Sequence, residues 1–326
     1  MKLNLKYLVI LGLILFAFIL SSINLQEVLK IISNASPYWV LGGVIFVVLE
    51  IVFKTLRWQV LLKNFSENYS FKQGIKNYLI GAAFGNVTPG KVGDFIKLFD
   101  LSKNAKLDKK TSFSVVLIDR IVDLFVVFVF GLISILVLVF LFQQNLEIMS
   151  YLVGLIIIVL ILFILFVLAV TSRKSFLYRL LELFNNLIPS KRIKLKTSGL
   201  LEKINSTFTS IKINSRFVLF LVFTVIAWLF VFLTPFFFSM ALGLQVEWLL
   251  FLIIFPIIVI VEILPISLLG LGTRDAAMLV LFGFLMVKPE AIIALSLMIL
   301  LFSHIPRTIV GFIVFWKSNI SFGEKK

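Results

Sequence analysis

The sequence contains no cysteine and only one histidine, His304, among its 326 residues. Without cysteine the chain can form neither a disulfide nor a thiolate-bound metal site, and the redox state of its compartment cannot be read from it. One histidine and scattered carboxylates provide no metal-ligand spacing, and the sequence has no nucleotide-binding motif. We therefore expect no metal and no other cofactor, and interpret the lone histidine as a packed polar residue.

Charged residues are also scarce. They make up 14% of the chain, whereas hydrophobic residues make up 61% and the mean hydropathy is +1.13. A soluble protein of this length would need a far more polar surface. The apolar residues occur in blocks of roughly 17 to 25, the length that a helix needs to cross about 30 Å of hydrocarbon. These features indicate an integral, polytopic membrane protein built from α-helices alone.

Acidic residues are outnumbered by basic ones, 16 to 31, and the basic residues lie mainly between the apolar blocks. This positive-inside pattern predicts that these segments and both termini are cytoplasmic. The longest basic segment, residues 171–216, also has apolar residues at helical spacing. It therefore predicts amphipathic helices on the anionic inner leaflet. A nucleic-acid-binding patch is the alternative, and we expect no nucleic-acid partner.

The apolar blocks predict about six full membrane spans. The N-terminal block resembles a signal peptide, but no convincing cleavage site follows it, so we interpret it as a retained first helix. Two further segments have both flanks on one side of the membrane and are predicted to be re-entrant helical hairpins of opposite orientation. One membrane domain, residues 1–326, is expected to hold hairpins at 73–101 and 248–287 and spans at 7–23, 37–62, 112–142, 149–170, 217–242 and 288–316.

The tips of the two predicted hairpins have similar sequences. The first reads NVTPGKVGDFIK from residue 86, and the second reads LPISLLGLGTRD from residue 264. Each combines a proline, two nearby glycines, a cation and an aspartate. Oppositely oriented broken helices that meet near the middle of the bilayer are typical of inverted-repeat transporters. We therefore predict an inverted repeat.

Broken helices at such tips free backbone polar groups, which must face protein or a wet cavity. The half-helix N-termini favour phosphate or another anion, and glycines allow its close approach. The alternative is that proline and glycine only kink the helices. The tip residues that we predict to bind substrate are Asn86, Pro89, Gly90, Lys91, Gly93, Asp94, Lys97, Gly270, Gly272, Arg274 and Asp275.

Other ionisable residues lie within the predicted spans. Each charge inside a bilayer costs about 2.5–3.5 kcal/mol on insertion scales, so such residues tend to pair and to face a functional interior. We add Arg57, Asp119, Arg120 and Asp123 to the predicted substrate-binding residues. Structural pairing is an open alternative for the last three, and an interfacial anchor is one for Arg57. Further charges that indicate a polar interior are Glu50, Lys54, Glu262, His304 and Arg307.

At these residues the chain resembles the membrane region of lysylphosphatidylglycerol synthases, a family also described as flippase-like integral membrane proteins. The family's Arg-Trp followed by Leu-Leu is matched from Arg57 to Leu62, and its Asp-Arg-x-x-Asp from Asp119 to Asp123. Its Asn-x-x-Pro-Gly-Arg-x-Gly-Glu element with a following arginine resembles NVTPGKVGDFIK. Its Pro-x-Ser-x-Gly-Gly-x-Gly-x-Arg-Glu element resembles PISLLGLGTRD. The resemblance covers essentially the whole chain.

The chain departs from this family pattern at five positions. Lysines at 91 and 97 stand in place of arginines, aspartates at 94 and 275 stand in place of glutamates, and Leu269 stands where the first glycine of a pair is usual. Lysine cannot grip a phosphate bidentately as arginine does. These departures therefore concern which headgroup is bound more than whether a site exists.

The resemblance implies a flippase in the cell membrane that moves an anionic phospholipid or a polyprenyl-phosphate-linked headgroup between leaflets. Synthases of this family carry a soluble aminoacyl-transfer domain after the membrane region. This chain stops ten residues after Trp316, so such catalysis would need a separate lipid-modifying enzyme as partner. Two other functions stay open: a membrane-embedded enzyme acting on lipid phosphates, and a membrane subunit of a separate synthase. Transport is favoured over catalysis because no catalytic motif is present, and a homo-oligomer is also compatible.

Overall fold

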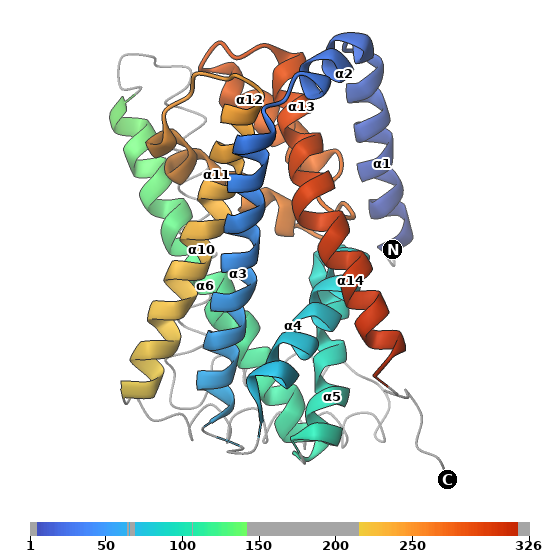
Figure 1. Cartoon of the computed structure of the whole chain (residues 1–326), viewed down its shortest axis with the longest axis vertical. Helices are drawn as coiled ribbons and strands as arrows, with labels where there is room; N and C mark the ends of the chain where they lie inside the picture. Colours follow the sequence, from blue (N-terminus) through green and yellow to red (C-terminus); the bar gives the residue numbers. More distant parts are fainter. Residues whose placement is uncertain (1–4, 64, 66–68, 106, 142–214, 319–326) are drawn as a thin grey trace, which may run out of the picture.

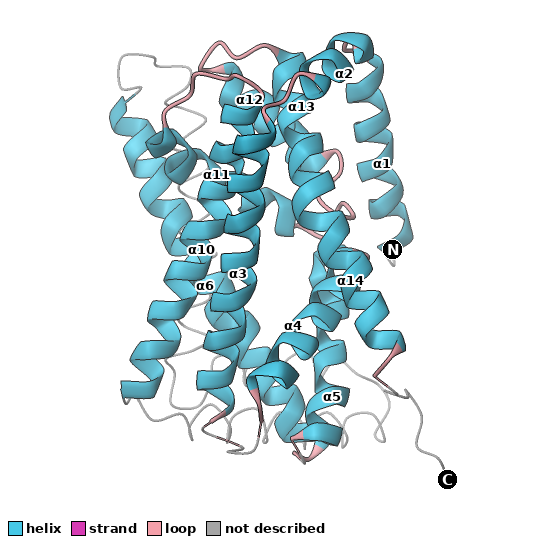
Figure 2. Cartoon of the chain, viewed as in Figure 1, coloured by secondary structure: helices cyan, strands magenta, loops and turns pink. Residues whose placement is uncertain are grey.

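The computed structural model describes residues 5–63, 65, 69–105, 107–141 and 215–318, and these residues form helices and no strand (Figure 2). Four helical stretches within them are long and apolar enough to cross a membrane. They confirm the helices predicted at 37–62, 112–142, 217–242 and 288–316. The predicted span 149–170 and residues 171–214 of the basic segment lie outside the described residues. The four stretches are α3 (Pro37–Leu62), α6 (Lys109–Leu141), α10 (Ser215–Ala241) and the run of α13 (Pro289–Ile299), a π-helical turn (Leu300–His304) and α14 (Ile305–Trp316).

The N-terminal region consists of two helices, α1 (Leu5–Ser21) and α2 (Leu25–Ser33), which meet at 86°. We predicted no helix between the spans at 7–23 and 37–62, where α2 lies. The Asn24 side chain caps α2 by accepting hydrogen bonds from the backbone N–H groups of Gln26 and Glu27, which leaves fewer unsatisfied donors at the helix start. Apolar residues at helical spacing then bury Val28 against the core. Capping and amphipathic spacing together explain why these residues are helical.

The first predicted hairpin corresponds to α4 (Phe71–Asn86), a 3-10 helix η1 (Pro89–Ile96) and α5 (Lys97–Asn104). In Figure 1, α4 runs from the lower end of the molecule to mid-height, and α5 returns to the lower end. The turn requires left-handed backbone at two consecutive residues, Gly90 (φ 63°) and Lys91 (φ 56°). Glycine adopts this conformation freely, whereas it strains a lysine. The strain marks Lys91 as a residue held in place by its surroundings.

The second predicted hairpin corresponds to α11 (Trp248–Ile263), a loop over 264–272 and α12 (Thr273–Gly283), all in the upper half of Figure 1. Its loop also uses left-handed glycines, Gly270 (φ 75°) and Gly272 (φ 81°). The two tips meet directly. The backbone N–H of Leu269 donates to the carbonyl oxygen of Asn86 at 3.3 Å, and Gly90 lies against Pro265. Each tip thereby satisfies backbone groups that the other's broken helix would leave unpaired.

Phenylalanine rings fill the interface between α3 and α10. The ring of Phe46 lies 5.2 Å from Phe230 and 4.2 Å from Phe237, and Phe53 lies 5.4 Å from Phe230. A Cβ at Gly43 would clash with the Phe238 ring, so this glycine lets the helices approach closely. Lipid tails are as apolar as these side chains, so such packing, rather than burial from water, holds membrane helices together.

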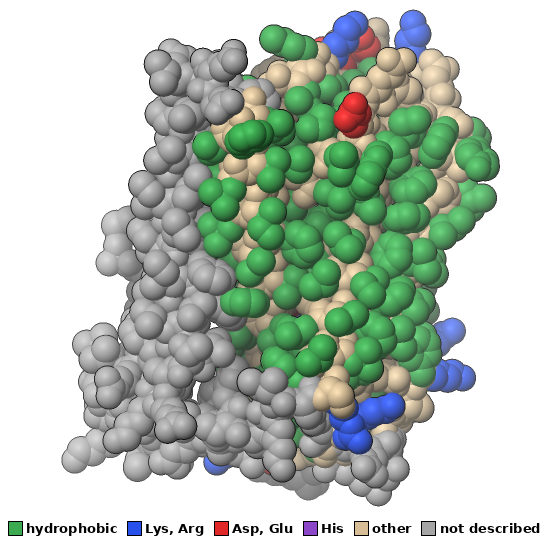
Figure 3. Space-filling model, turned by 90° about the vertical axis from the view of Figure 1, so that its left-hand side faces the viewer, with side chains coloured by type: hydrophobic (Ala, Val, Ile, Leu, Met, Phe, Trp, Pro, Cys, Tyr) green, Lys and Arg blue, Asp and Glu red, His purple; other side chains and the backbone are tan. Residues whose placement is uncertain are grey.

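Hydrophobic side chains cover the described part of the lateral face in Figure 3, and charged side chains lie near its upper and lower edges. Exposed basic residues concentrate at the lower end of Figure 1, where α4 and α6 begin and where α3 and α14 are followed by lysines. The connections at the upper end hold a mixture of acidic and basic residues. The basic residues at the lower end are Lys63, Lys72, Lys76, Lys109, Lys110 and Lys317. The charged residues at the upper end are Glu27, Lys30, Glu247, Lys288 and Glu290.

Single-cysteine labelling tests the predicted topology in a chain without native cysteine. We expect Lys72→Cys and Lys110→Cys to react with a membrane-impermeant maleimide only after permeabilisation of the cells. Gln245→Cys and Met286→Cys should react in intact cells. Lys72, Lys110 and Gln245 flank the predicted hairpins, Met286 lies at the end of the second one, and all four are exposed. Labelling of the two members of either pair from opposite sides would contradict the re-entrant arrangement.

Helix α14 packs closely on α4 through Gly311, where a Cβ would clash with the backbone oxygen of Leu79 and with Ala83. We expect Gly311→Ala to destabilise the protein by about 1–3 kcal/mol, because overpacking forces the two helices apart. Gly283→Ala is the matched control, since nothing lies within 4 Å of its added Cβ. Thermal unfolding in detergent should show a lower Tm for the first variant only. Equal Tm values for both variants would contradict the close packing.

Candidate functional site

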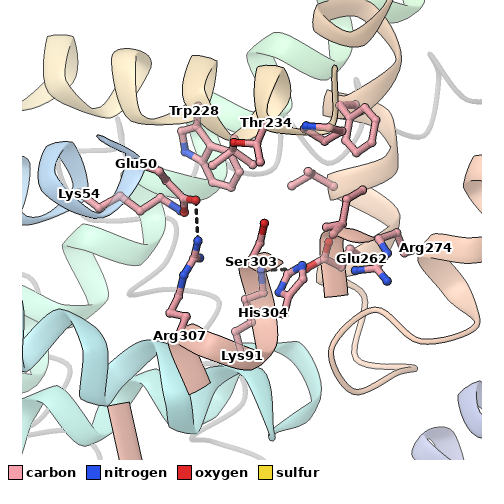
Figure 4. Close-up of a pocket in the computed structure, with 15 residues that line it drawn as sticks. Glu50, Lys54, Lys91, Trp228, Thr234, Glu262, Arg274, Ser303, His304 and Arg307 are labelled. Carbon is pink, nitrogen blue, oxygen red and sulfur yellow. Dashed lines mark hydrogen bonds and ion pairs between the residues drawn. The ribbon is translucent and has the colours of Figure 1, made fainter. Parts of the chain in front are cut away.

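A polar cavity of about 60 Å³ lies between α3, α10, α11, α12, η1 and the π-helical turn that precedes α14 (Figure 4). A buried water requires roughly 10–15 Å³, so the cavity has room for about four waters. Its polar lining is unusual for the interior of a membrane protein, where ionisable groups are costly. The lining side chains with polar or charged groups are Glu50, Lys54, Lys91, Trp228, Thr234, Glu262, Arg274, Ser303, His304 and Arg307.

On one side of the cavity, Glu50 of α3 binds two cations. Its carboxylate lies 2.9 Å from Lys54 Nζ on the next turn of α3 and 2.6 Å from Arg307 Nη2 on α14. The Lys54 ammonium also lies 4.6 Å from the centre of the Trp228 ring on α10, a favourable cation–π arrangement. One carboxylate thus links α3 to α14, and its lysine partner contacts α10.

On the opposite side, an ion pair joins the two tips. Lys91 Nζ of the first tip lies 3.2 Å from Glu262 Oε1, at the end of α11 in the second. The Lys91 side chain is 31% exposed, whereas the Glu262 side chain is 8% exposed. Figure 4 shows the lysine reaching up from η1 toward this carboxylate. The cation and the acid therefore come from the two different hairpins.

Arg274 differs from the other cavity cations because it donates its hydrogen bonds to neutral oxygens. It donates to Ser296 Oγ at 2.9 and 3.1 Å and to the carbonyl oxygen of Ser296 at 3.2 Å. The neighbouring Asp275 accepts from Ser296 Oγ and from the backbone N–H of Gly272 at 2.7 Å, so it caps α12. Its Oδ1 lies 3.7 Å from Arg274 Nη2. These bonds fix Arg274 in place while leaving its charge only loosely compensated.

The cavity lining carries a net positive charge. Four cations and two carboxylates face it, which gives 4 − 2 = +2 with His304 neutral. Three buried polar atoms of the lining have neither a hydrogen-bond nor an ion-pair partner among the described residues: Ser303 Oγ, His304 Nδ1 and Arg307 Nε. Buried polar atoms are normally paired, so these three point to water or a ligand in the cavity. The first two belong to the π-helical turn, a feature frequent at functional sites.

A second group of charges lies one helical turn from the cavity, toward the lower end of α3. Arg57 pairs with Asp119 at 2.9 Å and with Asp123 at 2.5 Å. Asp94 is fully buried and pairs with Lys97 at 2.9 Å and with Arg120 Nε at 2.6 Å. Three acids and three bases balance to zero. This charge cluster, which joins α3, the first hairpin and α6, consists of Arg57, Asp94, Lys97, Asp119, Arg120 and Asp123.

The charge cluster and the cavity share one connecting residue. Trp228 lines the cavity and donates its indole N–H to Asp123 Oδ1 at 2.9 Å. Below the cluster, Asp100 accepts hydrogen bonds from Tyr69 Oη at 2.5 Å and from Asn77 Nδ2 at 2.9 Å. Burial, together with this carboxylate, raises the pKa of the Tyr69 phenol, so the phenol stays a hydrogen-bond donor. These contacts hold α5 against α4 and against the residues that precede α4.

The predicted substrate-binding residues fall into three places. Lys91 and Arg274 line the cavity. Arg57, Asp94, Lys97, Asp119, Arg120 and Asp123 form the neutral charge cluster. Structural pairing was the stated alternative for Asp119, Arg120 and Asp123. The Asn86 side chain donates to Thr308 Oγ1 at 2.9 Å, and the Gly93 N–H donates to Thr88 Oγ1 at 2.7 Å. The remaining residues shape the tips or cap them, and they are Asn86, Pro89, Gly90, Gly93, Gly270, Gly272 and Asp275.

Five ionisable cavity residues were absent from the predicted substrate-binding set. Each is ionisable and lies within a predicted span or at its broken end, and that signal could have identified them. Their convergence could not be predicted from the sequence, because they come from α3, α11 and the stretch from the π-helical turn to α14, which are far apart in the chain. They are Glu50, Lys54, Glu262, His304 and Arg307. Within the described residues, no group of three or more His, Cys, Asp or Glu side chains could hold a metal ion.

Comparison with known proteins gives a family match. The model of the family described as "Lysylphosphatidylglycerol synthase TM region" matches residues 5–311. A UPF0104 membrane protein of Methanocaldococcus jannaschii is 23% identical over 323 residues, covering 96% of this chain and 95% of the relative. A UPF0104 membrane protein of Pyrococcus horikoshii is 23% identical over 327 residues, covering 96% and 97%. Their names state a membrane protein and no activity.

Removing one acid from the charge cluster tests its structural role. Asp94→Asn leaves Lys97 and Arg120 without their shared carboxylate, and breaking a buried pair costs about 3–5 kcal/mol. We therefore expect a clearly lower Tm in detergent. The control is Glu247→Gln at the exposed start of α11, which should change stability by no more than about 0.5 kcal/mol. An Asp94→Asn variant as stable as this control would contradict the structural role.

Proposed function

This chain belongs to the family of lysylphosphatidylglycerol synthase membrane regions, and from that premise we propose that it moves an anionic lipid headgroup between the two membrane leaflets. The observation that carries the proposal is the cavity with a net charge of +2 at the meeting point of the two tips. The lining residues lie near the middle of α3 and of the α13–α14 stretch. A polar site at that depth is where a headgroup needs support during its crossing.

The physical role of such a site is to replace water around the headgroup phosphate. An isolated charge in hydrocarbon costs several kcal/mol or more, and this cost is the barrier to spontaneous crossing. Cations already positioned in the cavity reduce that barrier because they need little reorganisation when the anion arrives. The acyl chains can remain in the surrounding lipid, so a cavity that accepts only the headgroup is sufficient.

We further propose that the lower end of the molecule in Figure 1 faces the cytoplasm, with both termini on that side. The exposed lysines at the starts of α4 and α6 and after α14 support this orientation by the positive-inside rule. The substrate classes that fit are an anionic phospholipid and a polyprenyl-phosphate lipid. A separate lipid-modifying enzyme would be a natural partner if the transported headgroup is made on one side of the membrane.

Reconstituted vesicles test the proposed translocation. Phosphatidylcholine vesicles with and without the protein would carry a trace of fluorescent phosphatidylglycerol or a fluorescent short polyprenyl phosphate, and an impermeant reductant would report the probe in the outer leaflet. We expect the protein to accelerate the crossing of at least one anionic probe. Lys91→Gln should slow this crossing by about tenfold or more, since it removes the most exposed cation of the cavity (tenfold corresponds to about 1.4 kcal/mol).

The matched control is Lys288→Gln, which removes an exposed lysine at the upper end, away from the cavity. Its translocation rate should equal that of the wild type. Crossing of both anionic probes at the rate of protein-free vesicles would contradict the proposal. Release of inorganic phosphate from the polyprenyl phosphate by the wild type would favour the enzyme alternative instead.

A further inference from the structure

Lys91 is the cavity cation most available to an incoming anion. Its side chain is 31% exposed, compared with 12% for Lys54, 10% for Arg307 and 1% for Arg274. Its distance to its carboxylate partner, 3.2 Å, is longer than the 2.9 and 2.6 Å of the pairs made by Glu50. An anionic headgroup is therefore expected to engage Lys91 first.

Glu262 occupies the position that such an anion would take. Its carboxylate is the acidic partner of Lys91, and its side chain is 8% exposed in the cavity wall. A phosphate that binds Lys91 must displace this carboxylate or lie beside it. Two anions held together in a poorly hydrated site repel strongly, so one of them takes up a proton. A phosphodiester does not accept a proton near neutral pH, which leaves Glu262 to do so.

We propose that Glu262 is a proton-binding site and that binding of the headgroup phosphate at Lys91 is coupled to uptake of one proton by the Glu262 carboxylate. This inference rests on the proposed function and identifies its coupling ion. The charges balance: the Lys91 ammonium passes from the carboxylate to the phosphate, and the carboxylate becomes a neutral carboxylic acid. When the headgroup leaves, the proton is released and the Lys91–Glu262 pair forms again.

The surroundings of Glu262 favour this exchange. The charged and titratable groups that face it in the cavity are Lys91 from η1, Arg274 from α12, His304 from the π-helical turn, Arg307 from α14, and Glu50 and Lys54 from α3. The Lys54 and Arg307 cations share the single Glu50 carboxylate, and Arg274 donates its hydrogen bonds to Ser296 and Leu269. Among the described residues Lys91 is the cation that forms an ion pair with Glu262, so once Lys91 is bound to phosphate the buried carboxylate loses that partner.

A route for the proton is present in the same wall. Ser303 Oγ and His304 Nδ1 line the cavity and have no hydrogen-bond partner among the described residues. Figure 4 shows the His304 ring next to Glu262, with Ser303 pointing into the space between the two ion pairs. A few waters in the cavity would connect these atoms to the carboxylate. His304 is thus a positioning residue for the proton, while Glu262 holds it.

The pH dependence of lipid binding tests this assignment in the full chain. Short-chain phosphatidylglycerol is a suitable probe because its phosphodiester keeps one negative charge between pH 5 and 8. We expect the apparent Kd of the wild type to rise with pH by up to tenfold per pH unit, as linkage to one proton requires. In a weakly buffered solution near neutral pH, binding should remove about one proton per lipid from the solvent. That second measurement needs no variant.

Glu262→Gln mimics the protonated carboxyl and should bind the probe with the same Kd from pH 5 to 8, about tenfold or more tighter than the wild type at pH 8. Glu262→Asp keeps a titratable group and should keep the slope. Glu50→Gln is the matched acid on the opposite wall. Its affinity is expected to change because Lys54 and Arg307 lose their carboxylate, but its pH slope should be that of the wild type.

Three results would overturn the coupling: binding by the wild type that is independent of pH, a slope that persists in Glu262→Gln, or a slope lost in His304→Gln while Glu262→Gln retains it. The last result would place the proton on the imidazole. Failure of the proposed function looks different. In that case the wild type would bind phosphatidylglycerol no better than phosphatidylcholine at any pH and would translocate no anionic probe.

Discussion

The pairing of charges inside an apolar protein is the constraint on which this structure depends. Sixteen acidic and 31 basic residues are present in a chain that is 61% hydrophobic, and the buried charges lie where oppositely charged or hydrogen-bonding groups from other elements meet them. Glu50 joins α3 to α14, Lys91 and Glu262 join the two tips, and the charge cluster joins α3 to the first hairpin and α6. An unpaired charge at these depths would cost more than most single packing contacts contribute.

The two groups of charges differ in how completely they are balanced. The charge cluster contains three acids and three bases, packed at short distances around the fully buried Asp94, and it holds the first hairpin against the long helices. The cavity one turn away has two more cations than acids. A cluster with balanced charges holds helices together, whereas an excess of positive charge is a condition for binding an anion. Trp228 touches both, so the cavity lies directly against the charge cluster.

The tips explain how broken helices can be stable at this depth. Left-handed backbone at Gly90, Lys91, Gly270 and Gly272 turns each chain sharply, and the hydrogen bond between Leu269 and Asn86 lets one tip satisfy the other. Each half-helix therefore depends on its counterpart. This mutual dependence places a cation and an acid from separate hairpins in one cavity, and it makes the Lys91–Glu262 pair the contact that a headgroup would have to open.

The sequence by itself determined the membrane class, four of the helical spans and the positions of both helix breaks, because hydropathy, the distribution of lysines and arginines, and the spacing of proline and glycine are local signals. It also marked every ionisable cavity residue as a charge in an apolar setting. The tertiary structure alone decided which of these charges lie together: Arg57 and Asp119 in the neutral charge cluster, and Glu50, Glu262 and Arg307 around a positive cavity. It also showed α2, a helix too short to stand out by hydropathy. Periodicity describes one helix at a time, whereas ion pairing across the bundle depends on how helices far apart in sequence are packed.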